Sequence, residues 1–264
     1  MKGIIHILLI FWSTGLFAQE GEKLITICQN FNYQEIENGL NYIQNKSTKK
    51  IKYNWRTELE RELINNFFEQ IIELNKEVQD EENPFIHTIY THKLKLIRTK
   101  DGKVAYYKIV QLKNVKSNGE WVPSELFIEE NSNDNLNHLK KDFQNTYSEP
   151  LDFEGLFETD IVFGSHCGID GMDPEYRYAM NELVESKDTK TLTKWLKSTT
   201  VEIQLYAIDG ILTLKRTGLS FDKKVLDLID IISKKEGTAY TCSGCTHWNQ
   251  PISEIVEEIK KENK

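Results

Sequence analysis

The chain has 264 residues, of which 41 are acidic and 33 are lysine or arginine, and its formal net charge at pH 7 is −8. Such an acidic chain repels phosphate backbones, and it has no basic stripe with interleaved aromatic residues, so nucleic acid is excluded as an expected partner. The length allows one large or two small domains with a genuine hydrophobic core.

The first residues have the pattern of a secretory signal peptide. Lys2 supplies a positive charge, an apolar run extends from Ile4 to Phe17, and the small residue Ala18 follows. We expect residues 1–18 to be removed and the mature protein to be exported, either to the periplasm or out of the cell. Cleavage removes one positive charge from the formal total of −8, which gives −9. No later segment is long and apolar enough to span a membrane, so no membrane span is expected after signal removal.

Two helices are predicted in the next part of the chain. Asn32 is typical of a helix N-cap, and the helix that it begins has an inward side made of Tyr33, Ile36, Leu40 and Ile43. Thr57 and Glu60 have the spacing of a capping box and predict a longer helix that ends at about Val78. Its apolar stripe consists of Leu59, Leu63, Phe67, Ile71, Leu74 and Val78.

From Ile86 the apolar pattern changes to the alternation of strands. Residues 93–96 and 104–110 alternate between polar and apolar side chains, and Trp121-Val122 lies in a third candidate strand. Turn signals stand between them, at Asp101-Gly102 and Asn118-Gly119. We therefore predict a three-stranded antiparallel meander with one face covered by the long helix. His87 and His92 have no obvious partner and are interpreted as ordinary surface or core histidines.

The middle of the chain contains a connector and a glycine-rich loop. Residues 134–147 predict a helix, and residues 148–160 mix acidic and aromatic side chains in the manner of a docked linker. Residues 164–171 contain three glycines in eight positions, which indicates either a cluster of turns or a close approach of the backbone to a ligand. This loop lacks the Gly-Lys-Ser/Thr of a phosphate loop, the Gly-x-Ser-x-Gly of a nucleophile elbow and the oxygen spacing of a calcium loop.

The remainder of the chain is predicted to be helical. Helix starts are expected at Asp173-Pro174, after Asp188, at Thr199, at Ser220 and at Pro251. The third of these helices contains Val201–Leu214, which is apolar on two faces and is therefore expected to lie between two layers. Thr199 and Glu202 have the spacing of a capping box, and Gly210 indicates a close helix crossing that needs the missing side chain.

Val201–Leu214 resembles the second-helix consensus of HEAT-type repeats. The resemblance rests on Tyr206-Ala207-Ile208 and Ile211-Leu212, whereas the arginine usual in that family is replaced by Gln204. It covers about one repeat and implies stacked helices that bind partners on an extended surface. The expected fold class is therefore α+β, with amino-terminal helices and a small β-meander in residues 19–150 and an all-α, HEAT-like layer in residues 151–264.

Four cysteines remain after signal removal: Cys28, Cys167, Cys242 and Cys245. In an exported protein an even number favours structural disulfides, formed either within the C-x-x-C at 242–245 or from that turn to Cys167. One alternative is a thiol–disulfide exchange site, although the strand–C-x-x-C–helix setting is missing. Another is a zinc site made of Cys167, Cys242, Cys245 and either His166 or His247. The adjacent His166-Cys167 is not expected to be a catalytic pair, because sequence neighbours rarely have the required geometry.

Two functional hypotheses follow from these patterns. The first is an exported, non-enzymatic binding or structural protein that serves an unknown protein or envelope partner and is stabilised by disulfides. The second is a thiol-active or zinc-dependent enzyme centred on the C-x-x-C and the His166-Cys167 loop.

Overall fold

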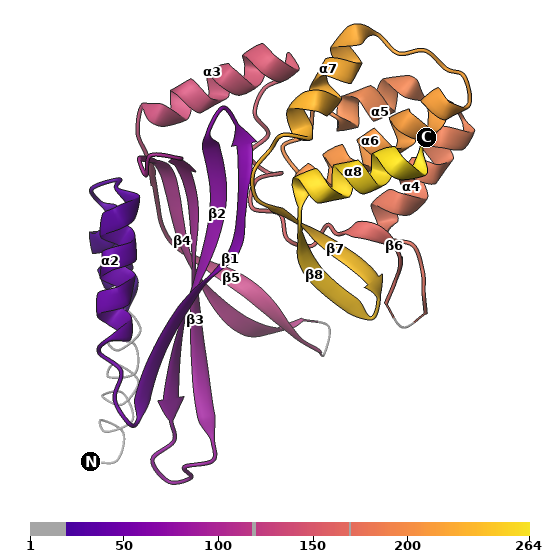
Figure 1. Ribbon diagram of the computed structural model, residues 1–264. Coiled ribbons are helices and arrows are strands. Elements are labelled where there is room, and N and C mark those ends of the chain that lie inside the picture. The colour runs from indigo at the N-terminus through magenta and orange to yellow at the C-terminus, as the bar shows by residue number, and fades with distance from the viewer. Residues whose placement is uncertain (1–19, 118–119, 169) are drawn as a thin grey trace. The chain divides into compact units, whose positions relative to one another are not determined.

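The computed structural model describes residues 20–117, 120–168 and 170–264 (Figure 1). The predicted signal peptide, residues 1–18, and the predicted turn at Asn118-Gly119 lie outside the described residues. The chain divides into two compact units. Unit 1 takes the chain up to Glu58 together with Gln70–Leu136, and unit 2 takes Leu59–Glu69 together with Asn137–Lys264.

Five consecutive strands form one sheet in the order β1-β2-β3-β4-β5. Their bounds are β1 (Ile51–Ile64), β2 (Phe67–Gln79), β3 (His87–Thr99), β4 (Val104–Ser117) and β5 (Glu120–Ser132). Strands β3, β4 and β5 are antiparallel neighbours and contain the three predicted strand segments, so the meander was predicted in part. The predicted turn between β3 and β4 is confirmed, because Gly102 has φ of 87°.

The long helix predicted from Thr57 to about Val78 is wrong, because these residues form the β1–β2 hairpin. Asn65 and Asn66 both have positive φ, 47° and 65°, and make the two-residue turn that reverses the chain. Every residue of β2 from Phe67 to Leu74 is buried, so apolar side chains on both faces of the strand produced a false helical stripe.

Two helices lie along one face of the sheet in unit 1 (Figure 1). Residues 20–28 are helical, and α2 (Tyr33–Gln44) follows as predicted, with the Asn32 side chain accepting a hydrogen bond from Glu35 N at 3.2 Å. Their apolar sides bury against the middle strands. The core of this unit comprises Leu24, Cys28, Ile36, Leu40, Ile43, Ile72, Leu74, Leu94, Leu96, Val104, Tyr107 and Ile109.

From Asn135 onward the chain is mainly helical. The helices are α3 (Asn135–Tyr147), α4 (Glu175–Glu185), α5 (Thr189–Trp195), α6 (Val201–Arg216), α7 (Lys223–Ile232) and α8 (Ile252–Glu262). In the described part of the chain, no helix is long and apolar enough to cross a membrane.

Helix α6 is the central helix of unit 2 and contacts α4, α5, α8, β6 and β7. Gly210 allows close packing here, since a Cβ atom there would lie 2.8 Å from Leu192 Cδ2 and the Leu192 side chain would have to shift. The predicted capping box of Thr199 and Glu202 is wrong. Thr200 is the N-cap and makes no side-chain capping bond, and the Glu202 carboxylate binds Arg61 instead.

The all-α prediction for residues 151–264 is also wrong, because unit 2 contains a three-stranded sheet. Its order is β6-β7-β8, with β6 (Phe163–Cys167) parallel to β7 (Thr238–Gly244) and β7 antiparallel to β8 (Thr246–Pro251). These strands have only five to seven residues and come from segments interpreted as loops. Short strands give too few alternations to be recognised. The pairing of β6 with β7 is also long-range, since Cys167 and Cys242 on these strands are 75 positions apart.

Candidate functional site

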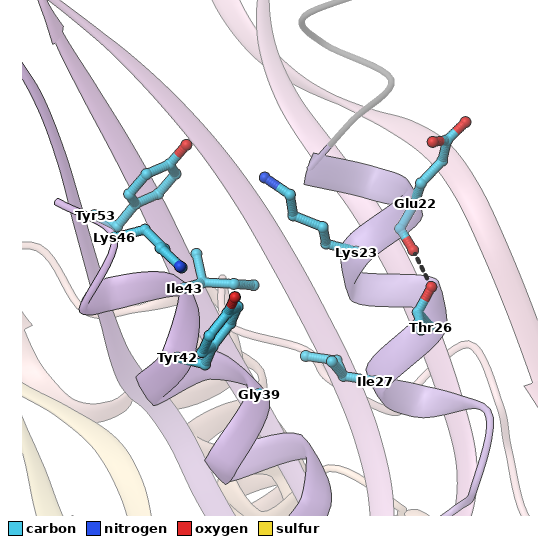
Figure 2. A pocket seen from close by; sticks show the side chains of 9 residues that line it. All are labelled: Glu22, Lys23, Thr26, Ile27, Gly39, Tyr42, Ile43, Lys46 and Tyr53. Carbon is cyan, nitrogen blue, oxygen red and sulfur yellow. Dashed lines mark hydrogen bonds between the residues drawn. The ribbon is translucent and has the colours of Figure 1, made fainter.

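A groove with a largely apolar lining lies in unit 1 between helix 20–28 and α2 (Figure 2). The two helices approach most closely at Gly39, where a Cβ atom would lie 2.5 Å from Ile27 Cγ2. Figure 2 shows that they stand further apart toward Lys23 and Lys46. The close contact at Gly39 therefore fixes one end of a groove that opens toward the start of helix 20–28.

The groove has a volume of about 630 Å³, and its inner surface is largely apolar. It is lined by Glu22, Lys23, Thr26, Ile27, Gly39, Tyr42, Ile43, Lys46 and Tyr53. Ile27 and Ile43 are aliphatic, and the Tyr42 side chain, 63 % exposed, leaves an aromatic ring open to solvent at the rim. A volume of this size lies within the range of pockets that hold small molecules.

Positive charge is in excess around this groove. The Glu20 carboxylate is buried and accepts hydrogen bonds from Lys76 Nζ at 3.1 Å and from Tyr53 Oη at 3.0 Å. Lys23 Nζ lies 3.9 Å from the same carboxylate, so one anion is shared by two ammonium groups. Lys46 Nζ lies 4.6 Å from the centre of the Tyr42 ring, and Figure 2 shows the Glu22 carboxylate pointing away from the groove.

The same buried charges lie near a histidine that has no hydrogen-bond partner. His92 is 2 % exposed, and neither ring nitrogen is bonded within the described residues. Burial lowers its pKa, nearby Lys76 lowers it further, and the Glu20 charge opposes the change. Its neighbour on β4 is the buried Gln111. His92 is therefore neutral in the folded protein, as expected for an ordinary core histidine.

This arrangement predicts a loss of stability in weak acid. The folded-state pKa of His92 is below the unfolded value of about 6.5. The free energy of unfolding that this difference contributes is therefore fully present above about pH 6.5 and is lost as the pH falls below it. The decrease is at most about 1.4 kcal/mol per pH unit for a single proton. We expect His92→Leu to be less sensitive than the wild-type protein to a change from pH 7 to pH 5, as measured by urea unfolding. The exposed His138 provides the control, because His138→Gln should keep the wild-type dependence of stability on pH. The prediction would be contradicted if His92→Leu kept that dependence as well.

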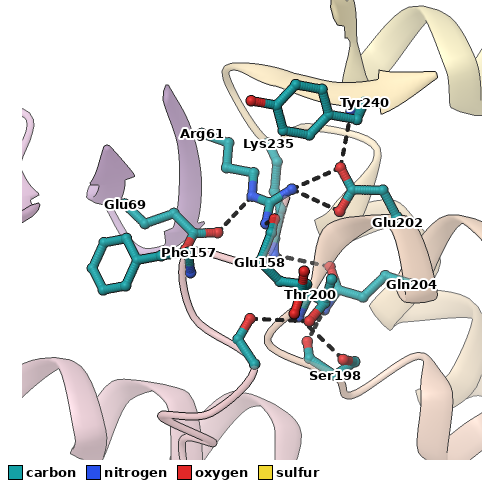
Figure 3. A network of polar contacts seen from close by, with 11 residues as sticks. Arg61, Glu69, Phe157, Glu158, Ser198, Thr200, Glu202, Gln204, Lys235 and Tyr240 are labelled. Atoms are coloured by element: carbon teal, nitrogen blue, oxygen red, sulfur yellow. Dashed lines mark hydrogen bonds and ion pairs between the residues drawn. The ribbon is translucent and has the colours of Figure 1, made fainter. Parts of the chain in front are cut away.

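Unit 2 contains a buried network of charged side chains, shown in Figure 3. Arg61, at the turn end of the hairpin, donates from Nε to Glu69 at 2.5 Å and from Nη1 to both Glu202 oxygens at 2.7 Å. All three side chains are 0 % exposed. Each carboxylate also accepts a backbone hydrogen bond, Glu69 from Phe157 N and Glu202 from Tyr240 N. A network that is closed to solvent and internally satisfied stabilises the fold and offers no access to a substrate.

The structure settles how the four cysteines are used. Cys167 and Cys242 form a disulfide with a Cα–Cα distance of 5.6 Å, so of the two predicted alternatives the bridge from the C-x-x-C turn to Cys167 is the one observed. Cys28 lies in the core of unit 1 as a free thiol, and burial raises its pKa to about 12. Cys245 is free and exposed on the turn between β7 and β8.

The residues proposed for zinc are brought to the same small sheet but not into a ligand set. His166 and His247 are both exposed, and His166 N donates to Asp173 Oδ1 at 3.1 Å. Among the described residues, no group of three or more His, Cys, Asp or Glu could hold a metal ion. Cys167 and Cys242 are bonded to each other and are therefore not thiolate ligands.

Gly164, the first glycine of the loop at 164–171, is required by the pairing of β6 with β7. A Cβ atom on Gly164 would lie closer to the Cys242 carbonyl oxygen than any real contact allows, so only glycine permits β6 to pair with β7 here. The close approach predicted from the glycine spacing is thus to a neighbouring strand.

Two other hollows lie in unit 2. One, of about 620 Å³, is lined by Lys215, Arg216 and Lys260 on α6 and α8. These cations lie in the last turns of α6 and α8, where positive charge interacts favourably with the negative end of the helix dipole. Their position therefore has a structural explanation. The other, of about 400 Å³, is acidic and lies beside Cys167 and Tyr176.

The groove was missed because helix 20–28 was not predicted. Leu24, Ile27 and Cys28 have the helical spacing i, i+3, i+4, which could have revealed it, although so short a pattern is ambiguous. The groove depends on the pairing of this helix with α2, which no local pattern specifies.

Comparisons with protein-family models, with curated proteins and with solved structures found no match to this chain.

Proposed function

We propose that this is an exported binding protein whose groove between helix 20–28 and α2 holds an elongated apolar molecule with an anionic end group, such as a fatty acid. The observation that carries the proposal is the combination of an apolar inner surface with the ammonium groups of Lys23 and Lys46 at the open end. In this non-enzymatic role, the groove binds its ligand and shields it from water without changing it chemically.

The charge balance favours an anion over a cation or a neutral molecule. Around the open end, Lys23, Lys46 and Lys76 supply three positive charges, and the buried Glu20 supplies one negative charge. Counting the outward-pointing Glu22 as well, the sum is still one positive charge in a protein whose formal total is negative. A carboxylate placed between the two lysines would make charge-assisted hydrogen bonds while its chain covers Ile27 and Ile43.

Export supports this role and is part of the proposal. Residues 1–18 have the signal-peptide pattern, and the disulfide between Cys167 and Cys242 is of a kind that persists in oxidising compartments. An envelope compartment supplies amphiphilic acids released from lipids, which is the chemistry that the groove would recognise.

We expect the mature chain to bind dodecanoate saturably and to bind dodecanol more weakly, as measured by isothermal titration calorimetry. Lys23→Met and Lys46→Met should each weaken dodecanoate binding about tenfold, because each removes one charge-assisted contact of about 1.4 kcal/mol. Neither variant should change dodecanol binding by more than about twofold, since the methionine keeps the apolar part of the lysine side chain.

Two further variants make this test specific. Lys224→Met removes an exposed lysine of α7 and should leave dodecanoate binding unchanged. Ile27→Trp enlarges a side chain that points into the groove in Figure 2 and should abolish binding of both probes. Absence of saturable dodecanoate binding, or equal affinities in all three Lys→Met variants, would show that the groove is not an anion-binding site.

A further inference from the structure

We propose that strand β5 is a self-association surface, through which two copies of this chain pair edge to edge about a two-fold axis at Ser124. The inference concerns the five-stranded sheet of unit 1 and is independent of the groove and of its proposed ligand. It assigns a second copy of the same chain as the partner, because the exposed side chains of β5 are complementary to themselves.

Strand β5 has an open edge. It is the last strand in the order β1-β2-β3-β4-β5, and in the described part of the chain no strand or bridge pairs with its outer side. Strand β4 pairs with β3 only as far as Leu112, whereas it pairs with β5 as far as Ser117. Beyond Leu112 the β4–β5 hairpin therefore leaves the sheet, as Figure 1 shows. The outer side of β5 is thus a main-chain edge to which another strand can bond.

Pro123 indicates which main-chain groups face this outer edge. Proline has no N–H, so within a sheet it is tolerated where its nitrogen faces away from the neighbouring strand. Pro123 is opposite Asn114 of β4, and its nitrogen is therefore expected to face outward. Peptide groups alternate along an antiparallel strand, so those of Trp121, Glu125 and Phe127 face the same way. Apart from the missing N–H of Pro123, the outward groups of these residues can all bond to a partner strand.

The stretch 121–127 exposes apolar side chains on both faces of the sheet. Trp121 and Phe127 lie on one face and are 70 % and 61 % exposed. Val122 and Leu126 lie on the other face and are 37 % and 43 % exposed. Apolar side chains on both faces of a projecting two-stranded hairpin are typical of an interaction surface.

An antiparallel pairing about Ser124 brings these side chains together. With Ser124 opposite its own copy, Trp121 of one chain lies opposite Phe127 of the other. In the same register, Val122 lies opposite Leu126 of the second copy. Aromatic residues therefore meet on one face and aliphatic residues meet on the other, and such cross-strand pairs stabilise antiparallel sheets. A single register thus matches all four apolar side chains.

Charge favours the same register. Glu125 is the acidic residue of the stretch, and its carboxylate is paired with Lys95 Nζ of its own chain at 2.8 Å. In the proposed register Glu125 lies opposite Pro123 of the second copy, so no two carboxylates face each other. An axis moved by one residue, to Glu125, would place the two Glu125 carboxylates opposite each other. It would also separate Trp121 from Phe127.

Two features of β5 limit the pairing to this stretch. Pro123 removes one donor from each strand, and an irregularity in the register with β4 follows directly after Phe127. Prolines and bulges of this kind ordinarily protect an edge strand from open-ended association. Here they leave a short ladder that is closed by its two-fold axis, so we expect a dimer and no larger assembly.

The size of the contact predicts a weak, reversible dimer. An aromatic side chain has about 150–250 Å² of surface, so Trp121 and Phe127 together expose roughly 250 Å² in each copy. With Val122, Leu126 and the paired main chain, the total buried area reaches about 1,000 Å², which is at the lower end of specific interfaces. We therefore expect a dissociation constant on the order of 10–100 µM.

The first test is sedimentation velocity of the mature protein from about 1 µM to about 300 µM, with Cys245→Ser in every sample to remove the exposed thiol. The sedimentation coefficient should rise from that of a monomer toward that of a dimer. Phe127→Glu places a carboxylate opposite Trp121 of the second copy and should weaken association at least tenfold. Phe85→Glu is the matched control, because Phe85 is 93 % exposed outside β5 and its loss should leave the dissociation constant unchanged.

Cross-linking tests the register itself. Residues directly opposite each other in a non-hydrogen-bonded pair have Cα atoms about 4.5 Å apart, which a disulfide can bridge. Ser124→Cys should therefore form a covalent dimer on mild oxidation, whereas Ser132→Cys, exposed at the end of the same strand, should do so about tenfold more slowly. The proposal is overturned by a protein that stays monomeric at about 300 µM or by Phe127→Glu that dimerises like its parent. Equal cross-linking rates for the two cysteine variants would overturn it as well.

Discussion

Replacement of Arg61 by methionine is expected to destabilise unit 2 by about 3–5 kcal/mol, which is the usual effect of removing one partner from a buried ion pair. The variant would leave the Glu69 and Glu202 carboxylates buried without their shared cation. Burial already raises the pKa of Glu202, and Arg61 is the main group that opposes this change. Hydrogen exchange of the α6 amides measures the effect, because α6 is central to unit 2.

Two controls separate lost charge pairing from lost volume. Lys103 forms an exposed ion pair with Asp101, and Lys103→Met should cost no more than about 1 kcal/mol. The triple variant Arg61→Met, Glu69→Gln, Glu202→Gln removes both stranded charges and keeps an acceptor for Phe157 N and Tyr240 N. It should therefore be more stable than Arg61→Met alone. A single variant that costs less than about 1 kcal/mol, or a triple variant that is less stable still, would contradict the interpretation of this network.

Removal of the disulfide is expected to have an effect of similar size. Cys167 and Cys242 are 75 residues apart, and closing a loop of this length restricts the unfolded chain by about 4 kcal/mol in the chain-entropy model. We therefore expect Cys167→Ala, Cys242→Ala to lower the free energy of unfolding by about 3–4 kcal/mol in urea titrations.

The wild-type protein with its disulfide reduced should unfold at nearly the same urea concentration as this double variant. Cys245→Ser should differ from the wild-type protein by less than about 0.5 kcal/mol, since its side chain is exposed. An unchanged midpoint after reduction would mean that the bridge does not restrict the unfolded chain.

Helical periodicity predicted several helices correctly, but it was misleading where a strand buried on both faces has apolar residues at helical spacing. One-sided stripes predicted α2 and α8, and a segment that is apolar on two faces predicted α6. The crossing at Gly210 was predicted because a mid-helix glycine needs a packing reason. The β1–β2 hairpin was missed because β2 is buried on both faces, and the Asn65-Asn66 turn was not recognised. The resemblance of Val201–Leu214 to HEAT-type repeats and the domain boundary at residue 150 stay predictions.

The candidate sites depended on long-range contacts that the sequence does not display. The cysteine pattern left two pairings open, within the C-x-x-C or from it to Cys167, because the β6–β7 pairing that decides between them joins segments that are distant in the chain. Arg61 and Glu202 are 141 residues apart, and Glu202 was predicted to form a capping box with Thr199. The groove requires helix 20–28 to pack beside Gly39, which is a property of two helices together.

The most direct test of the binding proposal is a map of backbone amide NMR shifts as the mature protein is titrated with dodecanoate. We expect the largest changes at Ile27, Gly39, Tyr42 and Lys46, with saturation at the same ligand concentration for all four. Changes confined to the hollow lined by Lys215 and Lys260, or no saturable change at all, would contradict the assignment of the groove as the binding site.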